Sequence, residues 1–158
     1  MRIGFGYDSH RFAEGRRLVL GGVEFPGEVG LAGHSDADVL IHAIIDALLG
    51  AAALGDIGSH FPDADARWKD ADSAELLASV VKEIRGAGYV IGNVDATVIC
   101  ERPKLRPYVE LIRDRLAAVM HVGKGRLSVK GKTNEKLDDV GAGLGIEVHA
   151  VCLLENAQ

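Results

Sequence analysis

The chain has 158 residues, a length typical of one domain that buries about 70% of its unfolded surface without disulfides or metals to hold it together. A hydrophobic content of 47% and a charged content of 26% are ordinary for a soluble globular protein. The net charge of −5 at pH 7 provides no basic surface, which argues against nucleic acid as a partner.

No segment predicts secretion or membrane insertion. The N-terminus lacks a charged region followed by an apolar stretch, so we expect no signal peptide. The most hydrophobic window, residues 39–54, contains His42 and Asp46 and is too short to span a bilayer. Cys100 and Cys152 are isolated thiols, which we interpret as small core residues, with a disulfide as the less favoured alternative. These features predict a cytoplasmic protein that does not bind membranes.

The first third of the chain predicts a strand, a hairpin and a buried helix. The expected elements are a strand over residues 2–12, a hairpin of residues 18–20 and 23–25, a loop over residues 26–33 and a helix over residues 36–49. The helix is apolar nearly all round, which is typical of a buried helix. Ser35 with Asp38 three residues later approximates a capping box at its start.

The rest of the chain alternates loops, helices and strands without repeats or linkers. The expected elements are a long loop over residues 56–69, a helix from Asp72 to Gly86 or Gly88, a strand over residues 89–100, a helix from Pro107, and strands over residues 126–132 and 146–154. A loop of fourteen or so residues in a compact domain is usually functional or disordered. We therefore expect residues 1–158 to form one α+β domain, with a mixed β-sheet and helices packed on one face.

Asp8 and His10 are the first candidates for metal binding. Their spacing of two places both side chains on the same face of a strand. With His42 they would supply one oxygen and two nitrogens, a donor set that suits Zn²⁺ with an open fourth position. The alternative is that Asp8 caps a turn and His42 is a hydrogen-bonded core histidine.

The predicted buried helix carries a line of polar residues that needs an explanation. Asp38, His42 and Asp46 follow each other at intervals of four and therefore share one face. Burying polar groups without partners is costly. We expect Asp38 and Asp46 to accept hydrogen bonds that orient the His42 ring in the second shell of the metal.

Three further polar segments are candidates for substrate binding. His34 and Ser35 precede the helix, where free backbone amides favour a phosphate, although plain N-capping by Ser35 is the alternative. Residues 130–135 carry Lys, Thr and Glu side chains that suit a phosphate with Mg²⁺, or else form a charged turn. Residues 100–106 form a loop bent by proline that offers backbone groups to a flat ligand, or only connects two elements.

Taken together in order, these segments resemble the 2-C-methyl-D-erythritol 2,4-cyclodiphosphate synthase family of the non-mevalonate isoprenoid pathway. The resemblance rests on Gly6-Tyr7-Asp8-Ser9-His10, Gly33-His34-Ser35-Asp36-x-Asp38, His42, the block from Asp46 through Asp56-Ile57-Gly58, Phe61-Pro62-Asp63-x-Asp65, and Lys132-Thr133-x-Glu135-Lys136-Leu137. It runs over essentially the whole chain.

The resemblance implies an assembly, a reaction and its cofactors. The assembly would be a homotrimer of α+β subunits with active sites between neighbouring subunits. The substrate would be a cytidine diphosphate compound, 4-diphosphocytidyl-2-C-methyl-D-erythritol 2-phosphate, which a phosphorus–oxygen lyase cyclises to 2-C-methyl-D-erythritol 2,4-cyclodiphosphate with release of CMP. Zn²⁺ would bind in the catalytic site, and Mg²⁺ or Mn²⁺ would bridge the diphosphate.

The resemblance also implies roles for individual residues. Asp8, His10 and His42 match the zinc ligands, Glu135 matches the ligand of the second divalent ion, and His34 and Thr133 match the pair that stabilises the transition state. The implied substrate contacts are Asp8, Ser9, His10, His34, Ser35, Asp56, Ile57, Gly58, Phe61, Pro62, Asp63, Ala64, Asp65, Cys100, Glu101, Arg102, Pro103, Lys104, Leu105, Arg106, Lys132, Thr133, Asn134 and Glu135. Of these, residues 100–106 correspond to the cytosine pocket.

The sequence departs from the family pattern after Leu137. Asp138 and Asp139 stand where the family usually has glycine and an aromatic residue, and Ala142 and Leu144 replace an arginine and a glutamate that face the trimer axis. Because both charges are lost together, no buried ion is left unpaired. We therefore expect no anion site in the central channel, and tight binding of an isoprenoid diphosphate there would contradict this.

Two other functions remain open at this point. A metal phosphoesterase would use a zinc-bound water as nucleophile and yield linear hydrolysis products. A trimeric diphosphate-binding module that has lost turnover would have the same pocket, and the altered segment 138–144 is its support.

Overall fold

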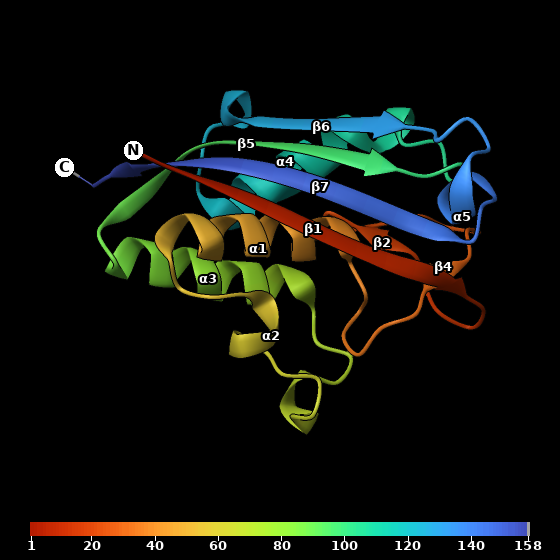
Figure 1. The fold of residues 1–158 in the computed structure, drawn as a ribbon, viewed down its shortest axis with the longest axis horizontal. Coiled ribbons are helices and arrows are strands. Elements are labelled where there is room, and N and C mark those ends of the chain that lie inside the picture. Colours follow the sequence, from red (N-terminus) through yellow and green to blue (C-terminus); the bar gives the residue numbers. More distant parts are fainter. Residues whose placement is uncertain (158) are drawn as a thin grey trace.

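The chain folds around a five-stranded mixed sheet, described by a computed structural model for residues 1–157 (Figure 1). The strands are β1 (Arg2–Ala13), β4 (Gly30–Leu31), β5 (Tyr89–Ile99), β6 (Leu127–Lys132) and β7 (Gly145–Asn156), in the order β4-β1-β7-β5-β6. Strands β5 and β6 are parallel, and the other neighbours are antiparallel. A separate hairpin joins β2 (Val19–Leu20) to β3 (Val23–Glu24). The prediction of an α+β domain with a mixed sheet is confirmed.

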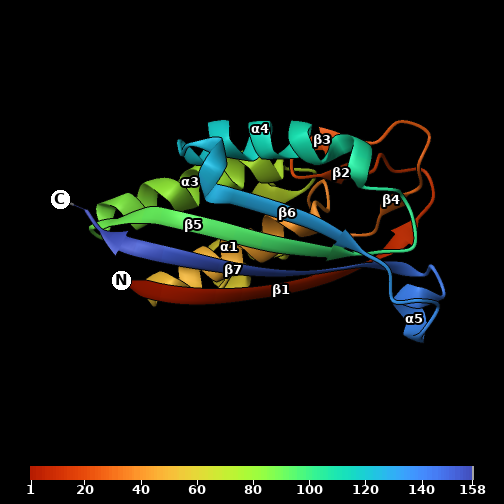
Figure 2. The same cartoon turned by 90° about the horizontal axis from the view of Figure 1, so that it is seen from above.

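Three long helices cover one face of the sheet (Figure 2). They are α1 (Val39–Ala52), α3 (Ser73–Gly86) and α4 (Val109–Met120). Short helices are α2 (Ile57–His60), α5 (Asp138–Gly141), and the 3-10 turns η1 (Ala66–Trp68), η2 (Arg106–Tyr108) and η3 (Lys124–Arg126). Of residues 1–157, no helix is both long enough and apolar enough to cross a membrane.

Glycines in β1 let the buried helix α1 approach the sheet very closely. A Cβ at Gly4 or Gly6 would lie 1.9 Å from a carbonyl oxygen of α1, that of Ala47 or Ala43 respectively. Side chains alternate along a strand, so Asp8 and His10 share the face of Gly4 and Gly6 and point toward the same helix. The close packing of β1 on α1 therefore brings two distant parts of the sequence together at the N-terminal end of α1.

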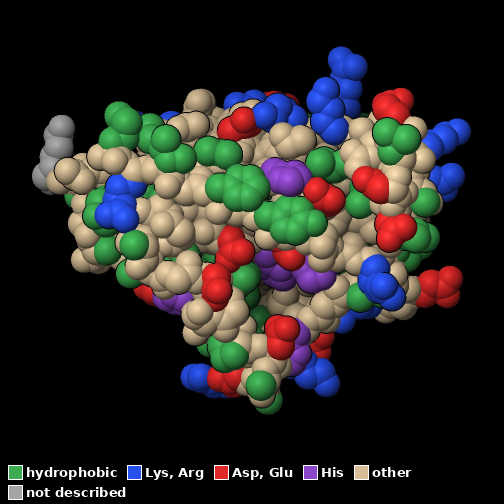
Figure 3. Space-filling view, in the orientation of Figure 1, with side chains coloured by type: hydrophobic (Ala, Val, Ile, Leu, Met, Phe, Trp, Pro, Cys, Tyr) green, Lys and Arg blue, Asp and Glu red, His purple; other side chains and the backbone are tan. Residues whose placement is uncertain are grey.

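The opposite face of the sheet carries exposed apolar side chains. Ile3, Phe5 and Tyr7 of β1 are 73%, 60% and 45% exposed, and Val151 of β7 lies beside them. Figure 3 shows hydrophobic side chains gathered next to a histidine over this face. The aromatic rings of Phe5 and Tyr7 lie 5.8 and 5.2 Å from that of His149.

Three predictions about the fold are wrong in detail. Helix α1 begins at Val39, because Asp38 itself is the N-cap and accepts from the Ile41 amide, so the predicted capping box with Ser35 does not form. The expected loop 26–33 contains β4, which pairs with the end of β1. The expected loop 56–69 contains α2 and η1, each begun by an aspartate cap. The interpretation of Cys100 and Cys152 as small core residues is confirmed, since both are buried free thiols.

Candidate metal centre and substrate site

Three predicted metal ligands converge at the N-terminal end of α1. His10 Nε2 and His42 Nδ1 lie 3.0 and 3.1 Å from Asp8 Oδ2, and 3.3 Å from each other. The side chains of Asp8, His10 and His42 are 27%, 19% and 11% exposed, so the triangle lies at the bottom of a depression rather than on an open surface. Figure 3 shows histidine and acidic side chains around this hollow.

The size and the chemistry of this triangle fit a metal ion. Ligands of a tetrahedral Zn²⁺ at about 2.0–2.1 Å lie about 3.3 Å apart, close to the three separations found here. Two imidazole nitrogens and one carboxylate oxygen form a donor set that suits zinc better than Mg²⁺ or Ca²⁺, which prefer oxygen. The three groups therefore form a candidate metal site with one side open to a ligand.

The charges of the triad stabilise each other in the absence of a metal. Burial alone would raise the pKa of Asp8, but hydrogen bonds and charge interactions with His10 and His42 outweigh it and hold that pKa well below its usual range. Burial lowers the pKa of His10, and the Asp8 carboxylate more than reverses this, so the net pKa of His10 is raised. The site thus keeps an ionised carboxylate next to its imidazoles.

In both histidines, the ring nitrogen that faces away from the triangle is hydrogen-bonded. His10 Nδ1 lies 2.6 Å from the carbonyl oxygen of Ala32, which can only accept, so Nδ1 carries the proton and Nε2 is free for a metal. His42 Nε2 lies 2.9 Å from Ser73 Oγ and 3.2 Å from Ser35 Oγ. Ser73 was not identified from the sequence.

The prediction that Asp38 and Asp46 orient His42 by accepting hydrogen bonds from its ring is wrong. Asp38 is fully buried, and its carboxylate accepts from the amides of Gly21, Gly22 and Ile41. Asp46 accepts from the Ile57 amide at 2.8 Å, which ties helix α1 to the start of α2. The polar line on α1 therefore serves three different partners.

A cavity of about 250 Å³ opens over the triad. It is lined by predicted site residues and by three residues that were not among them, Gly33, Trp68 and Leu76. The predicted lining residues are Asp8, His10, His34, Ser35, His42, Ile57, Gly58, Phe61 and Asp63. The Phe61 and Trp68 rings meet edge to face, with centroids 5.1 Å apart. This aromatic pair forms an apolar wall beside the polar metal ligands.

The other predicted substrate residues near this cavity shape its rim. Asp56 caps α2 by accepting from Ser59, and Asp65 caps η1 and pairs with Arg67 at 2.5 Å. The His34 ring lies 3.4 Å from the carbonyl oxygen of Asp65. Pro62 and Ala64 belong to the same exposed turn. Ser9 lies on the opposite face of β1 from Asp8 and His10, where it lines a different cavity with Asp139.

The remaining candidate residues gather at the far edge of the sheet. Because β5 and β6 are parallel, the segments that follow them, residues 100–106 and 132–135, leave the sheet side by side; the Cys100 amide donates to the carbonyl oxygen of Lys132 at 2.9 Å. Thr133 Oγ1 donates to Glu135 Oε1, and Asn134 donates to Asp138 at 2.8 Å.

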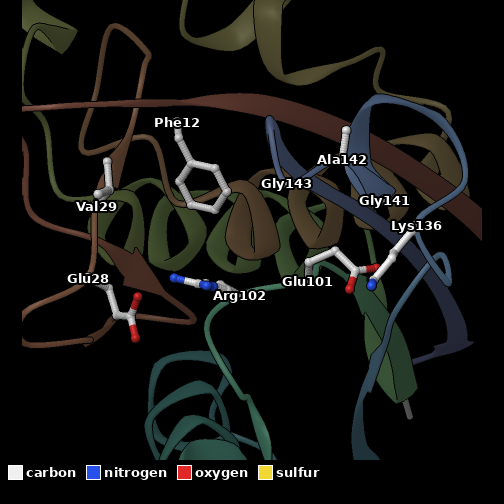
Figure 4. A pocket seen from close by; sticks show the side chains of 9 residues that line it. All are labelled: Phe12, Glu28, Val29, Glu101, Arg102, Lys136, Gly141, Ala142 and Gly143. Atoms are coloured by element: carbon white, nitrogen blue, oxygen red, sulfur yellow. The ribbon is translucent and has the colours of Figure 1, made fainter.

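A cavity of about 700 Å³ lies beside these two segments (Figure 4). Glu101 and Arg102 come from the first segment, and Lys136 follows the second; Phe12 and Val29 form an apolar wall. The region after Leu137 contributes Ala142 to this cavity, while Leu144 is 58% exposed.

Within the chain, the candidate residues form two clusters that lie apart. His34, beside the metal ligands, and Thr133, at the end of β6, are separated by the strands β7 and β5. Since neighbouring strands are about 4.8 Å apart, β1 and β6 lie roughly 14 Å from each other. The structure therefore brings the three candidate metal ligands together but does not bring His34 and Thr133 together in a single chain.

Comparison with known proteins gives one consistent family. The model of the YgbB family matches residues 1–155. A 2-C-methyl-D-erythritol 2,4-cyclodiphosphate synthase of Salinibacter ruber is 57% identical over 99% of this chain and 100% of its own length. The enzyme of that name from Gloeobacter violaceus is 59% identical over 98% of this chain and 95% of its own.

Solved structures agree with this. The bifunctional IspDF of Campylobacter jejuni superposes with a TM-score of 0.95 at 39% identity, covering 98% of this chain and 42% of that longer chain. A 2C-methyl-D-erythritol-2,4-cyclodiphosphate synthase in a CDP-bound form gives a TM-score of 0.89 at 39% identity, over 98% of this chain and 100% of its own. The CDP complex of Plasmodium falciparum IspF gives 0.87 at 38% identity, over 99% and 97%.

Proposed function

The chain belongs to the 2-C-methyl-D-erythritol 2,4-cyclodiphosphate synthase family, and we propose that it catalyses the reaction of that name. Residues 1–158 would act as one synthase domain in the cytoplasm. The substrate 4-diphosphocytidyl-2-C-methyl-D-erythritol 2-phosphate would be converted into 2-C-methyl-D-erythritol 2,4-cyclodiphosphate and CMP. The observation that carries the proposal is the convergence of Asp8, His10 and His42 beside a cavity large enough for phosphate groups. The CDP bound by two structural neighbours supports a cytidine diphosphate substrate.

The reaction is an intramolecular phosphoryl transfer that needs no nucleophile from the protein. An oxygen of the 2-phosphate attacks the β-phosphorus, the bond from that phosphorus to the α–β bridging oxygen breaks, and CMP leaves with the electron pair. Well-oriented intramolecular attack contributes roughly 7–11 kcal/mol to lowering the barrier. The task of the protein is to fold a flexible polyanion into line and to balance its charge.

We propose Asp8, His10 and His42 as ligands of Zn²⁺ and Glu135 as a ligand of Mg²⁺ or Mn²⁺. When bound, these ions would polarise phosphate oxygens and offset the repulsion between an acidic protein and its substrate. His34 and Thr133 would donate hydrogen bonds to the charge that develops on the transferred phosphate. Residues 56–58 and 61–65 would hold the ribose and erythritol, and residues 100–106 the cytosine.

We further propose that each active site forms between two subunits of a homotrimer. The metal ligands lie on one edge of the sheet and Thr133 and Glu135 on the other, so one chain presents two incomplete halves. The exposed side chains of Ile3, Phe5, Tyr7 and Val151 form an apolar surface of the kind that usually marks an interface. Packing of these sheet faces around a common axis would bring the metal half of one subunit next to the diphosphate half of its neighbour.

Product analysis tests the reaction against the two other functions. Purified protein is incubated with the substrate, Zn²⁺ and Mg²⁺, with and without a chelator, and the phosphorus NMR spectrum is followed. We expect the cyclic diphosphate and CMP in equal amounts, with both lost on chelation. Linear hydrolysis products would favour a metal phosphoesterase. Binding of CDP without any turnover would favour a binding module, for which the altered segment 138–144 is the support.

A further inference from the structure

The His42 ring is held on its outer side by a hydroxyl that is itself held by a carboxylate. Ser73 Oγ lies 2.9 Å from His42 Nε2, and Ser73 donates its hydroxyl proton to Asp36 Oδ1. The other oxygen of Asp36 accepts from the Ser73 amide at 3.0 Å. Ser73 is completely buried, so water does not compete for these bonds.

The direction of these bonds determines which nitrogen of His42 keeps its proton. Because the Ser73 proton points to Asp36, the Ser73 oxygen presents lone pairs to His42 and accepts from Nε2–H. A metal bound at the triad would take the place of the proton that Nδ1 otherwise donates to Asp8, and the ring then keeps its single proton on Nε2, where Ser73 accepts it. That is the tautomer which a metal at the triad needs.

Helix capping does not account for Ser73. It is the first residue of α3, and the N-cap of that helix is Asp72, whose side chain accepts from the Ala74 amide at 2.8 Å. The carboxylate of Asp36 is likewise not a cap of α1, since Asp38 fills that position. A buried hydroxyl that bonds to a half-buried carboxylate and is not a helix cap would be expected to serve a neighbouring group.

The backbone fixes the position of both residues. The Asp36 amide donates to the carbonyl oxygen of Ala71 at 3.1 Å, so the segment before α1 and the segment before α3 are tied together. Two hydrogen bonds join Asp36 to Ser73 and this one joins Asp36 to Ala71, and none of the three involves His42. His42 is oriented by a preassembled pair.

We propose that Ser73 and Asp36 are positioning residues of the metal centre: Ser73 accepts the Nε2–H of His42 and fixes the ring with Nδ1 toward the triad, and Asp36 orients Ser73. This rests on the proposed function of the triad as a metal site. Outer partners of metal ligands typically change metal affinity 10- to 100-fold when they are removed.

The test measures metal affinity rather than turnover. Zn²⁺ and Co²⁺ affinities are determined by competition with a chromophoric chelator for the wild-type protein, Ser73→Ala and Asp36→Ala. We expect each variant to bind about 10- to 100-fold more weakly, and the double variant to bind no more weakly than the worse single variant, because both residues act through one bond. Asp72→Ala is the matched control: it weakens the same end of α3, so its thermal midpoint should fall while its metal affinity stays within about twofold.

A second readout reports the hydrogen bond to Ser73 directly. Proton–nitrogen correlation spectra of the Zn²⁺-loaded wild type should show the Nε2–H of His42 as a downfield signal that exchanges slowly with water. In Zn²⁺-loaded Ser73→Ala we expect this signal to move upfield and to exchange faster. Should Ser73→Ala not fold, Ser73→Cys keeps the volume with a much weaker acceptor and should change the affinity and this signal in the same direction.

The outcomes separate this inference from the proposed function. Wild-type affinity and a wild-type Nε2–H signal of His42 in folded Ser73→Ala or Ser73→Cys would overturn the role of Ser73. A wild-type protein that binds neither Zn²⁺ nor Co²⁺ would instead overturn the metal centre itself.

Discussion

The two halves of the proposed active site are built in different ways. The metal half takes side chains from β1, α1 and the start of α3, which are far apart in sequence and are held by close packing and partly buried hydrogen bonds. The diphosphate half uses neighbours in one exposed segment, residues 133–138, held by bonds between residues two to four apart. Three of its residues, Glu135, Lys136 and Asp138, have φ values of 51°, 65° and 57°.

This difference indicates how each half responds to ligands and to mutation. A site made by tertiary packing is formed before the ligand arrives, because its ligands cannot move without disturbing the core. A loop with non-glycine residues in the left-handed region stores about 1 kcal/mol or more at each of them and depends on local bonds to stay in place. Mutations in the metal half should therefore abolish catalytic activity, and mutations in the diphosphate half should only weaken it.

The largest effect is expected from His42→Ala. Two ligands remain, and loss of one of three should reduce zinc affinity by several orders of magnitude and activity by about a thousandfold or more. Metal content by mass spectrometry and turnover by CMP release measure this. The circular dichroism spectrum should stay unchanged; activity that survives in a zinc-free variant would show that the triad is not the metal centre.

The next effect concerns the diphosphate half. Thr133→Val keeps the shape of the side chain and removes the hydroxyl that meets Glu135. We expect kcat to fall by about a hundredfold, a typical loss for one donor to the transition state, with zinc content unaffected. A loss of zinc from this variant would mean that the two halves are not independent.

A third experiment measures how the buried N-cap of α1, Asp38, makes the stability of the protein depend on pH. Burial raises the pKa of Asp38 to about 6, against the opposing effect of hydrogen bonds from Gly22, Ile41 and Gly21, and with a smaller contribution from Asp36. A carboxyl group whose pKa is higher in the folded state contributes stability below its unfolded value, and this contribution is lost as the pH rises through 6.

Denaturant unfolding of the metal-free protein at several pH values measures this contribution. The free energy of unfolding of wild type minus that of Asp38→Asn should fall by up to about 3 kcal/mol between pH 4 and pH 7. If this difference in unfolding free energy is constant or grows with pH, the pKa of Asp38 is not higher in the folded than in the unfolded protein.

The smallest effect is expected from the segment that departs from the family pattern. Asp138 accepts from the Asn134 side chain and from the Gly141 amide at 2.9 Å, and so joins the start of α5 to the diphosphate half. Asp138→Gly relieves the positive φ but removes both bonds, and we expect KM to rise a few-fold with metal affinity unchanged. Asp138→Asn retains one acceptor, so its KM should lie between those of the wild type and Asp138→Gly. Equal KM values in all three proteins would show that Asp138 does not stabilise the diphosphate half.

The sequence was sufficient to find the three residues of the candidate metal site and insufficient to find the groups that hold them. Alternation placed Asp8 and His10 on one face, and the polar positions on an apolar helix identified His42. The same pattern assigned Asp38 and Asp46 to His42, because spacing along a helix shows which side chains share a face but not which groups approach from other elements. Ser73 could not be found in this way, since a serine after an aspartate at a helix start has the pattern of an ordinary cap.

The separation of the two halves was also beyond the sequence. Thr133 and His34 both stand next to elements of one sheet, and only the strand order shows that two strands lie between them. The short helix α5 escaped prediction because Gly141 packs against the Lys136 backbone, a contact that no local pattern reports.

The most direct test of the account is complementation in mixed trimers. His42→Ala and Thr133→Val subunits, each nearly inactive alone, are unfolded together in equal amounts and refolded. If each site takes its metal half from one subunit and its diphosphate half from the neighbour, random assembly leaves about a quarter of the sites with both halves intact, and about a quarter of wild-type activity should return. Mixed trimers with no more activity than the parent variants would show that each active site is contained in a single chain.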